Sequence, residues 1–271
     1  MKIHKKSPTR MKAFSRVIDI HTHPVFFGEG AGKAELKALV ARALREGIEH
    51  MVVLGDVLKF GRLPTEAQVR TINDETAAVV ATAPGVFSGF CCLNPMLGEA
   101  AVAKELARGV NELGFVGIKL EFSNNARDER VMRPVMEGAA RYNIPVLQHS
   151  WSQTNIKERS FHSDPEDTCL LARRHPEVRI IMAHLTGCGF RGVRAARGLR
   201  NLWIDTSGGA PEAGLVEYAV DQLGADRVLY GSDLPIRDLP TAIARITGAE
   251  ISAADKQAIL FENARQLLGL S

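Results

Sequence analysis

Two histidines stand two residues apart at the end of a short apolar run near the start of the chain. The run, VIDIHTHP at 17–24, is otherwise typical of a buried β-strand, which has little structural use for such a pair. Because side chains alternate along a strand, His21 and His23 share one face and can point to one spot. Two neutral imidazoles aimed at one point suit a divalent metal ion. Imidazole and carboxylate ligands without thiolate favour Zn²⁺, with manganese, iron or cobalt as substitutes.

Other ionisable residues close apolar runs further along the chain. They are Lys119 and Glu121 around the end of one run, and His149, His184 and Asp233 at the ends of three more. A lone histidine at such a place is more often a hydrogen-bonded polar group than a ligand. Several histidines and an aspartate that all end apolar runs predict a joint metal site, provided that the fold brings these ends together.

Apolar runs alternate with helical patterns along the whole chain. The runs cover 17–20, 48–55, 86–94, 115–120, 144–149, 178–184, 202–207 and 227–233, and helical stretches follow each of them, for example at 33–47, 99–114 and 190–198. Continuous apolar runs indicate strands buried on both faces, as in a parallel sheet covered by helices. Eight such units in 271 residues, with no GxGxxG after the first, predict an α/β fold: a single-domain (β/α)8 TIM barrel. A barrel places its active site at the carboxyl ends of the strands, where the residues above lie.

The composition, with 45% apolar and 24% charged residues, is that of a soluble globular chain. Its longest apolar runs are far shorter than the ~20 residues that cross a bilayer, so no membrane association is expected. The first residues, MKIHKKSPTRMKAFSR, are basic but lack the apolar centre of a secretory signal. We therefore expect a cytoplasmic protein in which 1–271 form one domain and 1–15 a loosely ordered basic leader.

Charge and cysteine content bear on partners and compartment. The net charge is only +3, and the basic residues are scattered apart from short groups such as RGVRAARGLR at 191–200, which we interpret as a solvated helix face. No nucleic-acid partner is therefore expected. The four cysteines form no CxxC pair, which suits a reducing compartment, and ordinary buried thiols explain them.

Three further features bear on the substrate, and each has a plainer explanation. His162, in the polar segment 152–167, suits a lid or a substrate contact as well as a surface position. Arg237 follows the last run, where a guanidinium can meet a carboxylate or phosphate, although a surface arginine at a helix start also explains it. The segment DTSGG at 205–209 offers hydroxyls and glycines to a polar substrate, or an N-cap to the next helix.

Taken in order, the motifs resemble those of the amidohydrolase superfamily. They are DIHTHP at 19–24, GIK at 117–119, QH at 148–149, AHLTG at 183–187, GSD at 231–233 and NARQLL at 263–268. The resemblance spans 17–270 and is strongest to the amidohydrolase-related (amidohydrolase 2) branch. That branch includes aminocarboxymuconate-semialdehyde decarboxylase, resorcylate-type decarboxylases and lactone hydrolases. The resemblance implies that His21, His23, His149 and Asp233 bind metal and that His184 is the catalytic or second-metal histidine.

Lys119 bears on the number of metal ions. In binuclear relatives a carboxylated lysine from the fourth strand bridges two ions, whereas mononuclear decarboxylases of this branch lack that ligand. An unmodified Lys119 would instead anchor a substrate carboxylate or pair with Glu121. We expect one Zn²⁺ or another divalent ion such as Mn²⁺ per chain, and keep Lys119, Glu121, His162 and Arg237 as second-metal or substrate residues.

Two reactions suit these residues. In hydrolysis of a carboxylic ester, lactone or amide, the metal lowers the pKa of bound water towards roughly 7, and Asp233 acts as general base. His184 would stabilise charge on the carbonyl oxygen or orient the water. In decarboxylation of a small aromatic or muconate-like acid, Asp233 or His184 delivers a proton to the carbon that loses carbon dioxide. We expect hydrolysis of a small polar substrate, because it needs only the groups that the sequence most clearly provides, with decarboxylation as the alternative.

Two hypotheses of other classes stand beside the enzyme. An inactive barrel serving as a scaffold would have little reason to retain Asp233 and His184. A metal-dependent deoxyribonuclease of related fold would use Glu121, but its basic entrance is missing. A homodimer is the default expectation for the assembly, because twofold assemblies are common and occur in related proteins.

Overall fold

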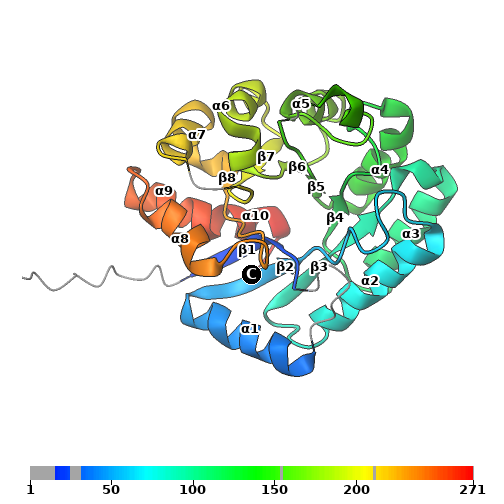
Figure 1. Ribbon diagram of the computed structural model, residues 1–271, viewed down its shortest axis with the longest axis horizontal. Coiled ribbons are helices and arrows are strands. Elements are labelled where there is room, and N and C mark those ends of the chain that lie inside the picture. The colour runs from blue at the N-terminus through cyan, green and yellow to red at the C-terminus, as the bar shows by residue number, and fades with distance from the viewer. Residues whose placement is uncertain (1–15, 25–31, 153–154, 210–211, 271) are drawn as a thin grey trace, which may run out of the picture.

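The computed structural model describes residues 16–24, 32–152, 155–209 and 212–270. Eight parallel strands form one sheet in the order β1-β2-β3-β4-β5-β6-β7-β8, with helices around it (Figure 1). The two edges of the sheet also meet, because β1 pairs with the residues directly after β8: Ile20 N donates to Tyr230 O over 3.0 Å, and Thr22 forms a bridge with Leu234. The sheet therefore closes on itself, and the predicted single-domain (β/α)8 barrel is confirmed.

The strands are β1 Val17–Thr22, β2 Ile48–Val53, β3 Phe87–Leu93, β4 Gly117–Leu120, β5 Val146–Gln148, β6 Ile180–Met182, β7 Leu202–Asp205 and β8 Val228–Leu229. The barrel helices are α1 Lys33–Arg45, α2 Glu66–Val80, α3 Glu99–Asn111, α4 Glu129–Tyr142, α5 Pro165–Arg174, α6 Leu185–Ala196, α7 Leu215–Leu223 and α8 Leu239–Thr247. The chain continues through α9 Ala253–Gln257, the π-helical turn Ala258–Glu262 and α10 Asn263–Leu268. Short 3₁₀ turns lie at Pro95–Leu97, Ile156–Glu158 and Ala225–Arg227.

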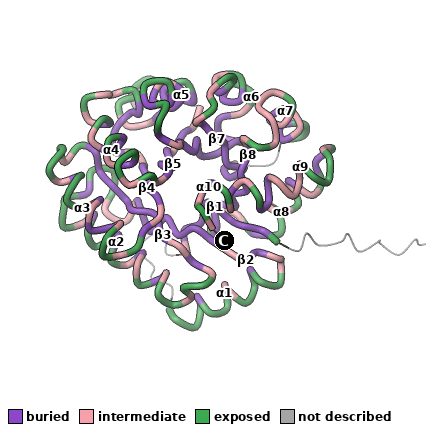
Figure 2. The backbone as a smooth tube through the Cα atoms, turned by 180° about the vertical axis from the view of Figure 1, so that it is seen from behind, coloured by how far each residue is buried: buried purple, intermediate pink, exposed green. Residues whose placement is uncertain are grey.

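Two layers of apolar side chains hold the barrel together. The inner cluster includes Ile20, Phe90 and Ile181 from the strands, and Phe261 and Leu267 near the carboxyl terminus pack against it. The outer cluster lies between strands and helices, and the purple strands in Figure 2 are accordingly surrounded by helices with green outer faces. Burial on both faces explains why the strand sequences are continuous apolar runs.

Most strands are shorter than the apolar runs that predict them, and three of them stop short of a predicted site residue. β5, β6 and β8 end before His149, His184 and Asp233, so these residues occupy the loops that follow. His184 and Asp233 adopt left-handed backbone conformations, with φ of 71° and 63°, which cannot continue a strand. Helix α6 then begins directly at Leu185, five residues before the expected start, because Gly187 N and Cys188 N both donate to His184 O.

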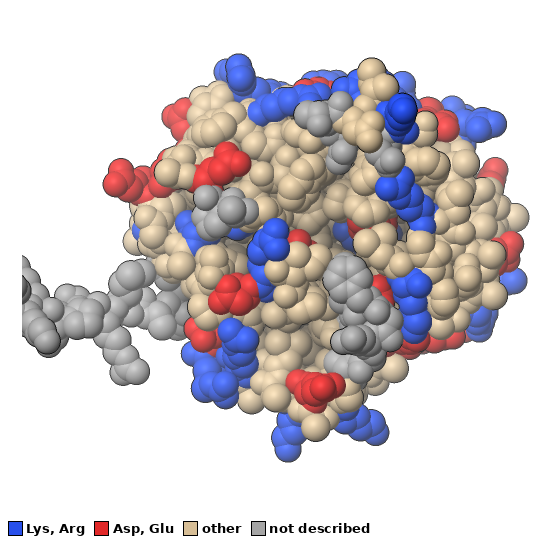
Figure 3. Space-filling model, in the orientation of Figure 1, with Lys and Arg blue, Asp and Glu red and all other residues tan. Residues whose placement is uncertain are grey.

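The amino-terminal leader expected at 1–15 lies outside the described residues. Across the parts of the chain that are described, none of the helices combines the length and the apolar character needed to cross a membrane. Charged residues of both signs are scattered over the face shown in Figure 3.

Candidate metal centre

One pocket of about 200 Å³ collects nearly all of the residues singled out by the sequence. It is lined by His21, His23, Val57, Leu58, Lys119, Glu121, Phe122, His149, Trp151, His184, Gly208, Asp233, Ile236 and Arg237. They come from β1 and β4 and from the loops after β1, β2, β4, β5, β6, β7 and β8, which all open at the carboxyl end of the barrel. The closed barrel thus brings together groups that are far apart in the sequence.

His21, His23 and Asp233 form a compact cluster of potential metal ligands in this pocket. One atom from each lies within 4.8 Å of the other two. Asp233 Oδ1 is 3.6 Å from His21 Nε2 and 4.0 Å from His23 Nε2, and all three residues are buried. His23 Nδ1 donates to Gly55 O over 2.7 Å, which leaves Nε2 to present a lone pair towards Asp233. Burial lowers the pKa of His23 to about 3, so this imidazole is neutral, as a metal ligand must be.

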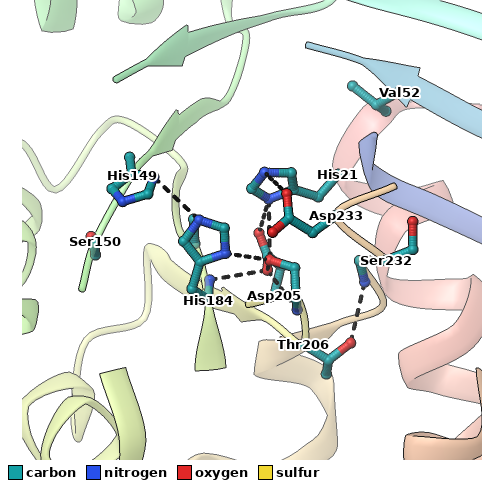
Figure 4. A network of polar contacts seen from close by, with 12 residues as sticks. His21, Val52, His149, Ser150, His184, Asp205, Thr206, Ser232 and Asp233 are labelled. Atoms are coloured by element: carbon teal, nitrogen blue, oxygen red, sulfur yellow. Dashed lines mark hydrogen bonds and ion pairs between the residues drawn. The ribbon is translucent and has the colours of Figure 1, made fainter. Parts of the chain in front are cut away.

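His21 is oriented by Asp205, the residue that ends β7. Because a carboxylate only accepts hydrogen bonds, His21 Nδ1 donates to Asp205 Oδ2, at 2.8 Å. His21 Nε2 is then left buried without a hydrogen-bond partner among the described residues. Such an orphaned lone pair beside a second imidazole and a carboxylate fits a divalent cation, and a carboxylate behind a ligating histidine is the usual support of such sites (Figure 4).

Asp205 also supports His184, and no sequence pattern predicts its contact with either histidine. Its Oδ1 accepts from His184 N over 3.1 Å and from Ser207 N over 2.9 Å. Burial alone would raise the pKa of Asp205, but His21, His184 and the hydrogen bond from the Ser207 side chain outweigh it and hold the pKa below its ordinary value. His21, His184 and Asp205 form a second group within 4.8 Å, yet the Asp205 oxygens already accept hydrogen bonds, so we assign this carboxylate to support.

His149 lies apart from the His21, His23 and Asp233 cluster and faces Glu121. Its Nδ1 is 3.0 Å from Glu121 Oε1 and 3.2 Å from His184 Nε2. Lys119 Nζ, fully buried, pairs with the other oxygen of Glu121 over 2.9 Å. Burial would raise the pKa of Glu121, but His149 and Lys119 overcome it and keep the pKa well below its usual range. The three residues therefore form one chain of polar contacts along a wall of the pocket.

Backbone contacts between the ends of β1 and β8 position Asp233. Asp233 N donates to His21 O over 2.8 Å, and Ser232 N donates to Asp19 Oδ1 over 2.9 Å. The left-handed conformations of Asp233 and His184 cost of order 1–3 kcal/mol each and are typical of residues held in place for function. Burial also raises the pKa of Asp233 above that of an ordinary aspartate.

The remaining predicted residues lie at or near the pocket. Arg237 lines the pocket, and its side chain is held by a hydrogen bond from Nε to Gly208 O over 3.0 Å. His162 does not line it but packs against Phe122, with ring centroids 4.4 Å apart, and Phe122 in turn packs against His149 at 4.2 Å. Phe122 and Trp151 line the pocket although no sequence pattern singled them out.

Comparison with known proteins fits this architecture. A sequence model of the amidohydrolase family matches residues 18–270. The chain belongs to the amidohydrolase family. This amidohydrolase is 27% identical over 252 residues to gamma-resorcylate decarboxylase from Rhodococcus jostii (strain RHA1), covering 74% of this chain and 76% of that one. It is 25% identical over 277 residues to gamma-resorcylate decarboxylase from Rhizobium sp. (strain MTP-10005), covering 83% and 84%.

Solved structures share the fold. A 2,6-dihydroxybenzoate decarboxylase complexed with 2,6-dihydroxybenzoate has a TM-score of 0.74 at 22% identity, covering 94% of this chain and 99% of that one. A dihydroxybenzoic acid decarboxylase from Polaromonas sp. JS666 with bound manganese and the inhibitor 2-nitroresorcinol has a TM-score of 0.72 at 20% identity, covering 94% and 97%.

The expectation that this amidohydrolase is a hydrolase is wrong, because the relatives named above are decarboxylases. The expectation rested on a metal site, Asp233 and His184, and decarboxylation needs the same groups. What favoured hydrolysis was the scarcity of groups to hold an acid. The pocket in fact places both Lys119 and Arg237 along its walls, with a flat aromatic side chain at Trp151.

Proposed function

We propose that this chain is a metal-dependent decarboxylase of a small aromatic acid of the hydroxybenzoate type. The observation that carries the proposal is the cluster of His21, His23 and Asp233 at a pocket that Lys119, Arg237 and two aromatic side chains also line. The names of the relatives support the same reaction class.

Size and charge of the pocket both suit such an acid. Its volume of about 200 Å³ is below the roughly 300–1,000 Å³ of pockets for drug-sized ligands, and is suited to a single small ring. A divalent ion with Lys119 and Arg237 supplies four positive charges, against three negative charges from Asp205, Glu121 and Asp233 when all are ionised. The surplus favours a substrate with one carboxylate.

The metal would be held by His21, His23 and Asp233, with His149 as the fourth candidate ligand. Mn²⁺ is the ion we favour, because a related decarboxylase structure contains manganese, and Zn²⁺ suits the same donors. When bound, the ion would supply a Lewis acid that polarises the substrate oxygens it contacts. His149 is now paired with Glu121, so its ring would have to turn to join the other three.

The residues themselves account for binding and proton transfer. Lys119 and Arg237 attract and orient the acid. Asp233 faces His21 and His23 through Oδ1, which leaves Oδ2 to carry a proton to the ring carbon that bears the carboxylate. The bond between that carbon and the carboxylate then breaks, its electrons return to the ring, and carbon dioxide leaves. Solvent returns a proton to Asp233, so one proton is consumed for each carbon dioxide released.

The direct test is carbon dioxide release by Mn²⁺-loaded protein from 2,6-dihydroxybenzoate and, in parallel, from 5-carboxyvanillate. In D₂O the product is expected to carry one deuterium at the carbon that lost its carboxylate. If no aromatic acid in the panel releases carbon dioxide while the protein is folded and metal-loaded, the proposal is rejected.

Metal content is expected to saturate near one ion per chain, with no effect of bicarbonate on reconstitution. Lys119 Nζ lies 2.9 Å from Glu121 Oε2 in a buried ion pair, and this pairing competes with the carbamate that a second ion requires. Elemental analysis of reconstituted protein checks this. Two ions per chain, with loading promoted by bicarbonate, would contradict it, and Lys119→Met, which cannot be carboxylated, is the control.

A further inference from the structure

Trp151 forms part of the pocket wall, two residues after His149. It is half-buried, and hydrogen bonds hold the backbone at Trp151 and at the next residue. Trp151 N donates to Ser163 O over 3.0 Å, and the neighbouring Ser152 N donates to Gly187 O over 3.0 Å. Ser152 Oγ donates to Cys188 O over 3.1 Å, so this loop is held against the start of α6.

The indole of Trp151 lies directly on the backbone of Gly187. A Cβ placed on Gly187 would be 2.3 Å from Cε3 and 2.6 Å from Cδ2 of the indole, which is closer than real atoms approach. Gly209 contacts the outer edge of the ring more loosely, since a Cβ there would be 3.6 Å from Cη2. The indole can therefore occupy this position only because residue 187 has no side chain.

The same indole stands edge-on to the imidazole of His184, with ring centroids 5.5 Å apart and planes inclined by 63°. His184 is itself 4.9 Å from the ring of His21, at the metal cluster. A large flat apolar surface is thus fixed beside the chemical groups of the pocket before any ligand arrives, which reduces the entropy lost on binding.

We propose that Trp151 is a specificity-determining residue, on whose indole a planar aromatic substrate packs. The inference deepens the function proposed above and rests on it for the class of substrate. Aromatic rings gain from offset or edge-to-face packing in addition to the area they bury, whereas an open-chain acid gains only the area. Trp151 therefore makes the pocket prefer aromatic acids to open-chain ones.

Kinetics of Trp151 variants test the preference. Trp151→Leu is expected to raise KM for 2,6-dihydroxybenzoate by about 3- to 10-fold, with a smaller change in kcat and no change in metal content. Trp151→Phe, which restores a ring, is expected to recover most of the loss. A merely structural role would lower metal content or kcat instead, and an unchanged KM in Trp151→Leu would overturn the proposal.

Two glycine variants distinguish the effect of where the Trp151 indole lies from the effect of its presence. Gly187→Ala is expected to displace the indole and to raise KM as Trp151→Leu does, although Trp151 itself remains. Gly209→Ala adds a methyl at an ordinary contact distance from the same ring, so its KM is expected to match that of the wild type. Equal KM values in Gly187→Ala, Gly209→Ala and the wild type would overturn the proposal.

Fluorescence provides a measurement that does not depend on turnover. The chain has two tryptophans, and Trp203 lies outside the pocket, with Nε1 donating to Asp226 O over 3.0 Å. In Trp203→Phe, 2,6-dihydroxybenzoate is expected to quench the remaining Trp151. In Trp151→Phe, where only Trp203 emits, the fluorescence is expected to stay unchanged once light absorption by 2,6-dihydroxybenzoate is corrected for.

The outcomes distinguish the two proposals. Quenching of Trp151 without carbon dioxide release would reject the proposed reaction and retain the aromatic surface. Carbon dioxide release without quenching of Trp151 fluorescence would overturn the specificity role alone. The quenching is measured in Trp203→Phe and as the difference between wild type and Trp151→Phe. Absence of both would reject both.

Discussion

Asp233→Asn is expected to lower kcat for carbon dioxide release by about 10²- to 10⁴-fold, the usual contribution of a positioned acid or base. The amide keeps an oxygen near His21 and His23 but has no acidic proton to give to the ring carbon. The loss is therefore expected in kcat even under conditions where the variant is fully loaded with Mn²⁺. Measuring kcat and metal content on the same preparation separates proton transfer from metal binding.

Asp238→Asn is the matched control for this change. Asp238 lies five residues further along the same loop, is exposed and precedes α8, where asparagine is as good an N-cap as aspartate. Its activity is expected to equal that of the wild type. A fully loaded Asp233→Asn protein that keeps more than about a tenth of the wild-type kcat would assign proton transfer to another group.

His21→Ala is expected to weaken metal binding by at least about 100-fold and to abolish measurable turnover. The variant removes the Nε2 lone pair that has no other partner and one of the three atoms of the cluster. The barrel is expected to remain folded, because Asp205 keeps its hydrogen bonds from His184 N and Ser207 N. Circular dichroism and metal titration on the same protein check both statements.

His50→Ala controls for the loss of a strand histidine. His50 lies in β2, where its Nε2 contacts Ser88 Oγ at 2.9 Å, and it does not line the pocket. This variant is expected to bind metal normally. If His21→Ala binds as much metal as His50→Ala, the assignment of His21 as a ligand fails.

The barrel could be predicted from the sequence because its cause is local. Each apolar run is buried on both faces, and the burial pattern of β1 shows no exposed position. The pair formed by His21 and His23 was also predictable, since both follow from the alternation of one strand. The structure places their ring centroids 5.3 Å apart.

The support of the site could not be predicted, because it depends on contacts between distant strands. Asp205 looked like the end of a strand or a helix cap, and only the closed barrel brings it 2.8 Å from His21 Nδ1. Trp151 carries no motif, and its position depends on the absence of a side chain at Gly187. The reaction was mistaken for a related reason: Asp233 and His184 serve hydrolysis and decarboxylation alike, and the sequence does not reveal the shape of the pocket beside them.

The barrel closes where β1 meets the segment after β8, and this affects when the candidate metal site can form. The ribosome makes His21 and His23 before Asp233, which follows about 210 residues after His23. At about 5–20 residues per second the ribosome needs roughly ten to forty seconds to span that interval. A nascent chain thus contains the two imidazoles before their carboxylate exists, and under the proposed ligand set high-affinity metal binding would have to await Asp233. Once bound, the ion would connect β1 with the segment after β8. It would therefore stabilise only those chains that had been synthesised past Asp233.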